Sequence, residues 1–155
     1  IGKTILHLAV LKGHPGIVRL LLERSDVDPN ANNKSGETPL YSAIMTKDIA
    51  IVQALLERED VDVNEKNKSG ETPLYAAIRN RDIAIVQILL ERKDVDLNDK
   101  NMNEETPLFS AVLNRDIEIV QSLLRRTDVD PNVKNKVCSI YSQISIKSDD
   151  SVRKT

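Results

Sequence analysis

Acidic and amide residues recur in this sequence at the spacing of a calcium-binding loop. The segment 60–71 places Asp, Asp and Asn at the first, third and fifth positions of such a loop and Glu at the twelfth. Oxygen ligands at these positions bind Ca²⁺ in EF-hand loops. The same arrangement occurs in the segments 26–37 and 94–105. A calcium-responsive module is therefore one interpretation of the chain.

Other features of the same segments argue against calcium. The glycine that an EF-hand loop needs at its sixth position is absent, and Ala31, Glu65 and Asp99 stand there instead. The eighth position, which we expect to be aliphatic, is asparagine in each copy, and Lys68 adds a positive charge to the second copy. A projecting loop explains these residues without a metal, so we predict no metal and no other cofactor.

The remaining candidates for chemistry are two histidines and one cysteine. His7 and His14 could bind a metal or act as an acid–base pair, but their positions favour structural roles. Cys138 has no second cysteine at CxxC spacing, and a single cysteine suits a reducing, intracellular and cytoplasmic compartment. We find no glycine-rich phosphate loop and no grouping of nucleophile, base and orienting residue. The sequence therefore predicts that the chain is not an enzyme.

The elements that must position these residues repeat with a fixed period. The string Glu-Thr-Pro-Leu followed by an aromatic residue begins at Glu37, Glu71 and Glu105, a spacing of 34 residues. The segments 36–69 and 70–103 are identical at 24 of 34 positions. A period of this length is typical of a solenoid, which offers an extended surface rather than a deep pocket. The pattern favours binding over catalysis.

Each period predicts two short helices followed by a projecting loop. The hydroxyl of Thr72 can cap the first helix, and Pro73 follows at the first helical position, where no backbone N–H is needed. Asp82 can cap the second helix, in which apolar residues recur at helical spacing. The segment 94–103 then alternates polar and apolar residues and ends in turn-forming residues. We interpret the recurring Glu57-Arg58 and its copies as a solvated outer face.

These repeats resemble ankyrin repeats. The resemblance is carried by the runs 72–77, 85–90 and 94–98 and their copies, together with His7 and Gly13. The chain departs from the family where tyrosine or phenylalanine replaces the usual histidine and where lysine or arginine replaces the glycine. The resemblance implies an all-α ankyrin-repeat solenoid of stacked helix-turn-helix pairs with projecting β-hairpin-like fingers.

We expect one ankyrin-repeat domain over residues 1–146 and a frayed polar tail over 147–155. The expected repeats are 2–35, 36–69, 70–103, 104–135 and a degenerate fifth at 136–146. The first helix, which includes Ile5 and Leu8, is apolar nearly all round, whereas a terminal repeat normally has a polar outer face. We therefore expect the chain to continue upstream or a partner to cover this face.

The resemblance implies a protein–protein interaction module, such as a scaffold, adaptor or targeting segment, that binds another protein with its concave face. This face consists of the finger tips and the exposed residues of the first helices. Positions that differ between near-identical repeats are free of the stacking constraint. The predicted contact residues are Leu11, Lys12, Lys34, Ser35, Glu37, Met45, Thr46, Lys68, Ser69, Glu71, Arg79, Asn80, Met102, Asn103, Glu105, Leu113 and Asn114.

Two groups of these residues carry further expectations. Arg79 is expected to act as an anchor, because arginine is enriched at binding hot spots, and Met45 is an adaptable contact. The three recurring glutamates could select a basic partner or could serve the helix dipoles. The resemblance also implies asparagine hydroxylation at the finger asparagines, which are Asn30, Asn64, Asn98 and Asn132.

The composition excludes other classes of partner. The net charge of −2, the 3% of aromatic residues and the lack of a basic cluster argue against nucleic acid. No apolar run approaches ~20 residues, so no membrane span is expected. We expect a monomeric domain within a larger protein. A purely architectural spacer is the alternative, because it would use the same fold without a partner of its own.

Overall fold

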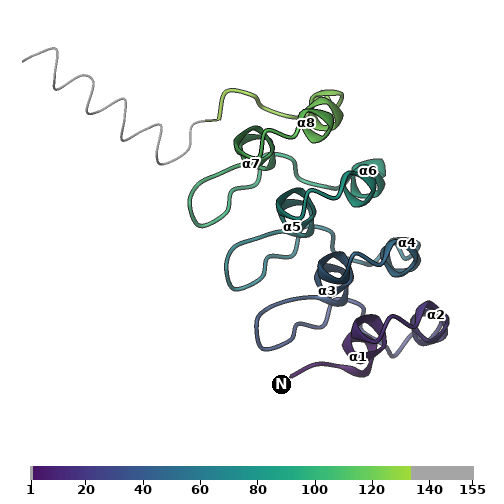
Figure 1. The fold of residues 1–155 in the computed structure, drawn as a ribbon. Helices are drawn as coiled ribbons and strands as arrows, with labels where there is room; N and C mark the ends of the chain where they lie inside the picture. The colour runs from purple at the N-terminus through teal and green to yellow at the C-terminus, as the bar shows by residue number, and fades with distance from the viewer. Residues whose placement is uncertain (1, 134–155) are drawn as a thin grey trace, which may run out of the picture.

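The computed structural model describes residues 2–133, which form helix pairs stacked in two columns (Figure 1). The odd-numbered helices form one column and the even-numbered helices form the other. A loop, here called a finger, projects from the odd-numbered column between one pair and the next. The helices are α1 (Ile5–Leu11), α2 (Pro15–Leu22), α3 (Pro39–Thr46), α4 (Ile49–Leu56), α5 (Pro73–Arg79), α6 (Ile83–Glu91), α7 (Pro107–Leu113) and α8 (Ile117–Leu124).

The predicted capping residues start the helices. The Thr38 hydroxyl accepts a hydrogen bond from the Tyr41 backbone N–H at 3.1 Å, and the Asp48 carboxylate accepts one from Ile51 N–H at 3.1 Å. These bonds satisfy backbone donors that have no partner within the helix. The same caps recur at Thr72, Thr106, Asp82 and Asp116.

The turn between the helices of a pair requires a left-handed backbone. Gly13 has a φ of 65° there, and Lys47, Arg81 and Arg115 adopt φ values of 57°, 56° and 55° at the equivalent positions. A side chain in this conformation brings Cβ close to the following carbonyl oxygen, which costs about 1–2 kcal/mol. The replacement of glycine in three of the repeats therefore carries an energetic cost.

The core runs without interruption through the stack. Leu40 and Ile44 from α3 and Ile51 and Leu55 from α4 are fully buried, and their equivalents in the next repeat are buried in the same way. α1 packs against α3 and α2 packs against α4, and the later pairs continue the pattern. Each pair thus buries its apolar faces against its neighbours, as a solenoid requires.

The fingers are closed by turns. The Asn33 N–H donates to the Glu37 carbonyl at 3.0 Å and the Gly36 N–H donates to the Asn33 carbonyl at 2.9 Å. The next finger joins the first through Lys68 N–H, which donates to the Ser35 carbonyl at 3.0 Å. Within residues 2–133 no β-strand is formed, so the fingers have a hairpin course without a β-ladder.

The predicted fifth repeat at 136–146, the tail at 147–155 and Cys138 lie outside the described residues. The domain boundaries that depend on them stay predictions.

Candidate partner-binding face

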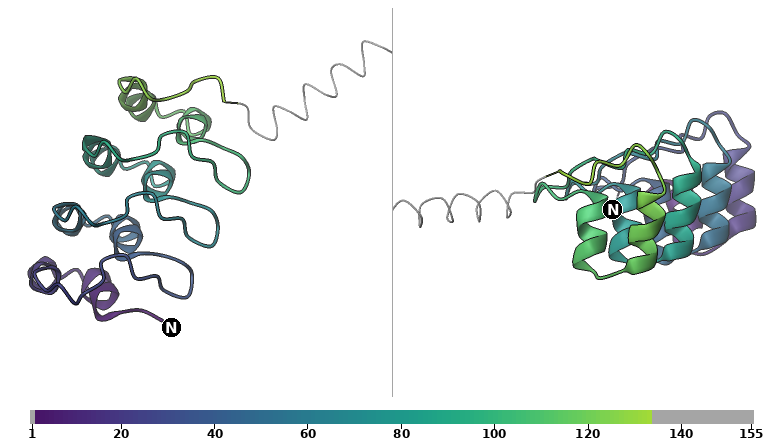
Figure 2. Two further views of the ribbon diagram at one scale, coloured as in Figure 1. Left: turned by 180° about the vertical axis from the view of Figure 1, so that it is seen from behind. Right: turned by 90° about the horizontal axis from the view of Figure 1, so that it is seen from above.

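The predicted contact residues lie in the fingers and at the ends of the odd-numbered helices, which form the column that carries the fingers (Figure 2). We keep the name concave face for this side, defined by the finger tips and the C-terminal ends of the odd-numbered helices. The exposed members are Leu11, Lys12, Lys34, Ser35, Met45, Thr46, Lys68, Ser69, Arg79, Met102, Asn103 and Leu113. The half-buried members are Glu37, Glu71, Asn80, Glu105 and Asn114.

Apolar side chains are exposed along this face. Leu11 is 37% exposed, Met45 42%, Leu113 60% and Met102 69%. Three of these residues occupy one repeat position, which Arg79 occupies in the third repeat. The position just before it is fully buried in the first three repeats, as Val10, Ile44 and Ile78, so the packing of the stack does not extend to this position.

Arg79 belongs to a polar cluster that joins two repeats. Its Nη2 atom lies 3.2 Å from Oε2 of Glu71 and donates to the Tyr41 hydroxyl oxygen at 3.3 Å. The Tyr41 hydroxyl donates to the same Glu71 oxygen at 2.6 Å. Burial raises the pKa of Tyr41, and the hydrogen bond to Glu71 raises it further. The guanidinium is therefore partly engaged within the protein, while the Arg79 side chain stays 48% exposed.

Tyr75 repeats the connection one layer further. Its hydroxyl donates to Oε2 of Glu105 at 2.7 Å and accepts from Asn101 Nδ2 and Ser110 Oγ, each at 2.6 Å. The pKa of Tyr75 is raised to about 12, because burial and the hydrogen bond to Glu105 raise it by more than the hydrogen bond from Ser110 lowers it. Glu71 and Glu105 thus bridge adjacent repeats through tyrosine. This bridge accounts for them without a basic partner.

The tyrosine bridge takes the place of a histidine bridge. In the first repeat, His7 is fully buried, and its Nε2 atom donates to the backbone carbonyl of Glu37 at 2.9 Å. Its other ring nitrogen accepts from the Thr4 N–H at 3.3 Å. Both ring nitrogens of His7 are used in structural bonds, as the sequence interpretation expected.

A small hollow opens on the concave face between α5 and α7. Its volume is about 200 Å³, large enough to admit a side chain. It is lined by Tyr75, Arg79, Glu105, Ser110, Leu113 and Asn114. Leu113 forms an apolar wall of this hollow, and the carboxylate of Glu105 lies beside it. This carboxylate accepts hydrogen bonds but forms no ion pair within the described part of the chain.

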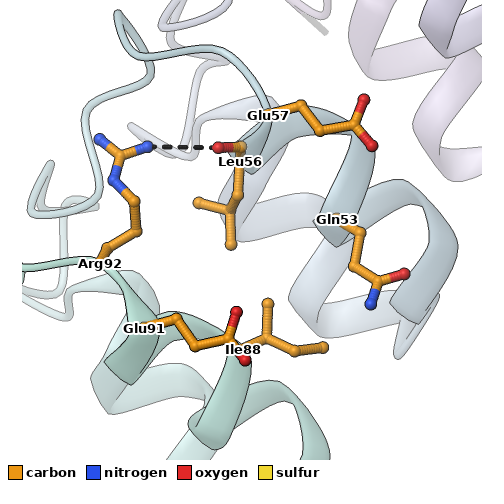
Figure 3. A pocket seen from close by; sticks show the side chains of 6 residues that line it. All are labelled: Gln53, Leu56, Glu57, Ile88, Glu91 and Arg92. Carbon is orange, nitrogen blue, oxygen red and sulfur yellow. Dashed lines mark hydrogen bonds between the residues drawn. The ribbon is translucent and has the colours of Figure 1, made fainter.

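A larger hollow of about 460 Å³ lies on the opposite side, between α4 and α6 (Figure 3). Its lining is Gln53, Leu56, Glu57, Ile88, Glu91 and Arg92. Similar hollows of about 230 Å³ lie between α2 and α4 and between α6 and α8. Their recurrence at every layer indicates that they arise from the stacking of the helices.

Arginines next to these hollows have a role that the sequence interpretation missed. Arg58 donates two hydrogen bonds to the carboxylate of Asp60, of 2.8 and 2.5 Å. It also donates a hydrogen bond of 2.8 Å to the backbone carbonyl of Leu22 at the end of α2. Arg92 and Arg126 repeat the arrangement, and their side chains are only 20% and 22% exposed. The assignment of Arg58 and Arg92 to a solvated face is therefore wrong. The sequence signal that could have shown this role is the Arg-x-Asp string, which recurs once in each repeat.

The finger asparagines connect one finger to the next. Asn64 Nδ2 donates to the Asp94 carbonyl at 2.7 Å, and its Oδ1 accepts from the Asp96 N–H at 2.9 Å. Asn30 and Asn98 make the same pair of bonds, whereas Asn132 is exposed. These amides are structural bridges. Hydroxylation at these positions stays a prediction.

The carboxylates of the calcium-like segment 60–71 each form bonds with a different residue of the protein. Asp60 pairs with Arg58, Asp62 accepts from the Asn64 N–H at 2.8 Å, and Glu71 pairs with Tyr41. Within residues 2–133, no three His, Cys, Asp or Glu residues are grouped to hold a metal ion.

Comparisons with known proteins agree with this architecture. The family model described as ankyrin repeats (3 copies) matches residues 1–67 and 59–135. The chain belongs to the ankyrin-repeat family. A crystal structure of the ankyrin-repeat domain of Bcl-3, described as a unique member of the IkappaB protein family, is 32% identical with a TM-score of 0.80. The match covers 89% of this chain and 60% of the Bcl-3 chain.

Other comparisons show how general this fold is. No curated protein sequence matches the chain. Chains of solved structures match in large number, 526 in all, so the ankyrin architecture alone specifies no partner. Ankyrin repeats are generally protein–protein interaction modules and are typically not enzymes. None of the helices that the structure describes is long and apolar enough to cross a membrane.

Proposed function

We propose that this chain is a noncovalent protein-binding module and that its partner contacts the concave face. The observation that carries the proposal is the exposure of Leu11, Met45 and Leu113 at one repeat position, although the position just before it is fully buried in Val10, Ile44 and Ile78. Exposed apolar side chains that the stack does not need are suited to a partner, because burying them removes apolar surface from water.

The hollow beside Leu113 suggests the chemistry of the partner. An apolar partner side chain would fit against Leu113, and a basic group next to it would meet the carboxylate of Glu105, which accepts hydrogen bonds but forms no ion pair within residues 2–133. A stable complex would bury about 1,200–2,000 Å² in total. The finger tips, including exposed Met102, would form the rim of this contact.

Paired substitutions test the proposal. The chain and a Met45→Asp/Leu113→Asp variant are used as baits in a cell lysate, with an Ile49→Asp/Leu124→Asp variant as control. The control residues are exposed to a similar degree, 40% and 53%, but lie on the outer helices α4 and α8. We expect a retained protein to bind the chain and the control equally and to bind the concave-face variant at least about tenfold more weakly, a loss of about 1.4 kcal/mol.

The ion pair with Glu71 decides which substitution of Arg79 tests binding alone. Because its guanidinium lies 3.2 Å from the carboxylate of Glu71, Arg79→Glu would place two carboxylates together and test folding as well as binding. Arg79→Gln removes the charge without this repulsion. Equal affinity of all the variants for the retained protein would reject the concave face, and retention of no protein by any of them would favour the architectural spacer.

A further inference from the structure

The concave face contains two equivalent tyrosine–glutamate pairs, one in each of two neighbouring layers. Tyr41 of α3 donates a hydrogen bond to the Glu71 carboxylate at 2.6 Å, and Tyr75 of α5 donates one to the Glu105 carboxylate at 2.7 Å. The second pair repeats the first at a spacing of 34 residues. Both pairs therefore offer the same set of oxygens, a carboxylate and a hydroxyl, to a hydrogen-bond donor.

The first pair holds a guanidinium that the chain itself supplies. The Nη2 atom of Arg79 lies 3.2 Å from the Glu71 carboxylate and donates to the Tyr41 hydroxyl oxygen at 3.3 Å. One guanidinium nitrogen thus contacts the carboxylate and the hydroxyl together. A glutamate that is bonded to its tyrosine therefore still accepts a cation.

The second pair has no arginine at the equivalent position. Leu113 stands there, and its side chain is 60% exposed. The Oε2 atom of Glu105 accepts from Tyr75 and from Asn101, whereas its Oε1 atom accepts no hydrogen bond within residues 2–133. Both Glu105 and Leu113 line the hollow of about 200 Å³ between α5 and α7. The site that Arg79 fills in one layer is thus open in the next.

The charges around this hollow favour a cation. Arg79 also lines the hollow, but its guanidinium is paired with Glu71, and the two opposite charges offset each other. The carboxylate of Glu105 forms no ion pair in the described part of the chain. Of these three charges, the negative charge of Glu105 is therefore the one that is left without compensation.

We propose that an arginine side chain of the partner occupies this hollow. Its guanidinium contacts Glu105 and Tyr75 in the way seen in the first pair, and its carbon chain packs against Leu113. The proposal rests on the concave face as the binding surface and specifies which residue of the partner enters it. Arginine suits the hollow better than lysine, because its planar guanidinium donates several hydrogen bonds in a fixed geometry while its carbon chain packs on apolar surface.

Short peptides test the hollow without the partner. N-acetyl-Ala-Arg-Ala-amide is titrated into the chain, and the backbone amide NMR signals of Ser110 and Asn114 report binding. The same peptide with lysine or with uncharged citrulline in place of arginine is the control. We expect the arginine peptide to give saturable shifts at millimolar concentration, the lysine peptide to bind at least about fivefold more weakly, and the citrulline peptide not to saturate.

Variants of the chain locate this binding. Glu105→Gln should weaken the arginine peptide at least about fivefold, whereas Glu118→Gln, the same change of charge at an exposed position of α8, should have no effect. Leu113→Arg should place the chain's own guanidinium on Glu105 and abolish binding. Leu113→Met, which introduces the residue of the second repeat, should retain it. Urea unfolding checks that each variant folds.

Other outcomes would overturn the proposal. Equal shifts from the three peptides would do so, as would a folded Glu105→Gln variant that binds the arginine peptide as tightly as the chain does. The protein retained from lysate separates this failure from a failure of the concave face. If Met45→Asp/Leu113→Asp loses that protein and Glu105→Gln does not, the concave face stands and the arginine is wrong. A dimer in sedimentation that Leu113→Arg abolishes would assign the hollow to a second copy of the chain instead.

Discussion

At the residue scale, the turn within each helix pair shows where the sequence departs from the most stable choice. Arg115 adopts a φ of 55°, which glycine adopts without strain. We predict that Arg115→Gly raises the free energy of unfolding by about 1 kcal/mol, because the cost of the left-handed conformation is removed. Arg125→Gly is the control, since Arg125 is also exposed but has a right-handed φ of −70°. It should be neutral or destabilising, and stabilisation by both variants would contradict the explanation.

The arginines that hold the preceding helix end give a second prediction. Arg92→Ala should destabilise the chain by about 1–2 kcal/mol, because it leaves carbonyls of the preceding repeat without their donor. Arg24→Ala removes only the exposed pair with Asp26 and should cost less than about 1 kcal/mol. Urea unfolding measures both. Equal losses would mean that the contact between repeats contributes nothing.

The buried tyrosines predict how stability depends on pH. The pKa of Tyr75 is raised from 10.0 to about 12, so the folded chain holds the phenol proton more tightly than the unfolded chain does. The stabilisation is complete below pH 10 and is lost as the pH rises toward 12. We predict that the urea midpoint falls across this range and falls less steeply in Tyr75→Phe. A profile that this substitution does not change would contradict the assignment.

At the element scale, the sequence predicted the helices well because their signals are local. Threonine and aspartate caps, the prolines at first helical positions and the apolar spacing depend only on neighbouring residues, and the structure places them as expected. The roles of Arg58, Glu71 and Asn64 could not be read in this way. Their partners lie in the adjacent repeat, at a distance that only the stacked structure defines.

The concave face was predictable only in outline. Differences between repeats identified the exposed positions at Met45 and Leu113, but they also selected Asn80 and Asn114, which donate to carbonyls of the preceding odd-numbered helix at 3.4 and 3.3 Å. A position can vary between repeats and still contact its neighbour. Variability alone therefore does not separate contacts to a partner from contacts within the stack.

The fingers give a prediction at this scale. Asn64→Ala removes both bonds to the next finger and leaves the Asp94 carbonyl and Asp96 N–H without their partner, so it should cost about 1–3 kcal/mol. Asn132→Ala is the matched control, because Asn132 is exposed at the last described finger. Thermal unfolding measures both. A similar loss in the two variants would contradict the asparagine bridge.

At the scale of the whole molecule, residues 2–133 form a regular stack in which each helix pair packs against the adjacent pairs. Such a stack separates its surfaces by role. The outer helices and fingers hold the layers together, whereas the concave face carries exposed apolar residues that the stack does not use. A partner is therefore expected on the concave face.

Hydrogen exchange of the chain, with and without the protein it retains from lysate, tests this claim most directly. We predict that binding slows exchange at the ends of α3, α5 and α7 and at the finger tips, and leaves α4, α6 and α8 unchanged. Protection confined to the outer helices, or exchange that binding does not alter anywhere in residues 2–133, would contradict the concave face as the binding surface.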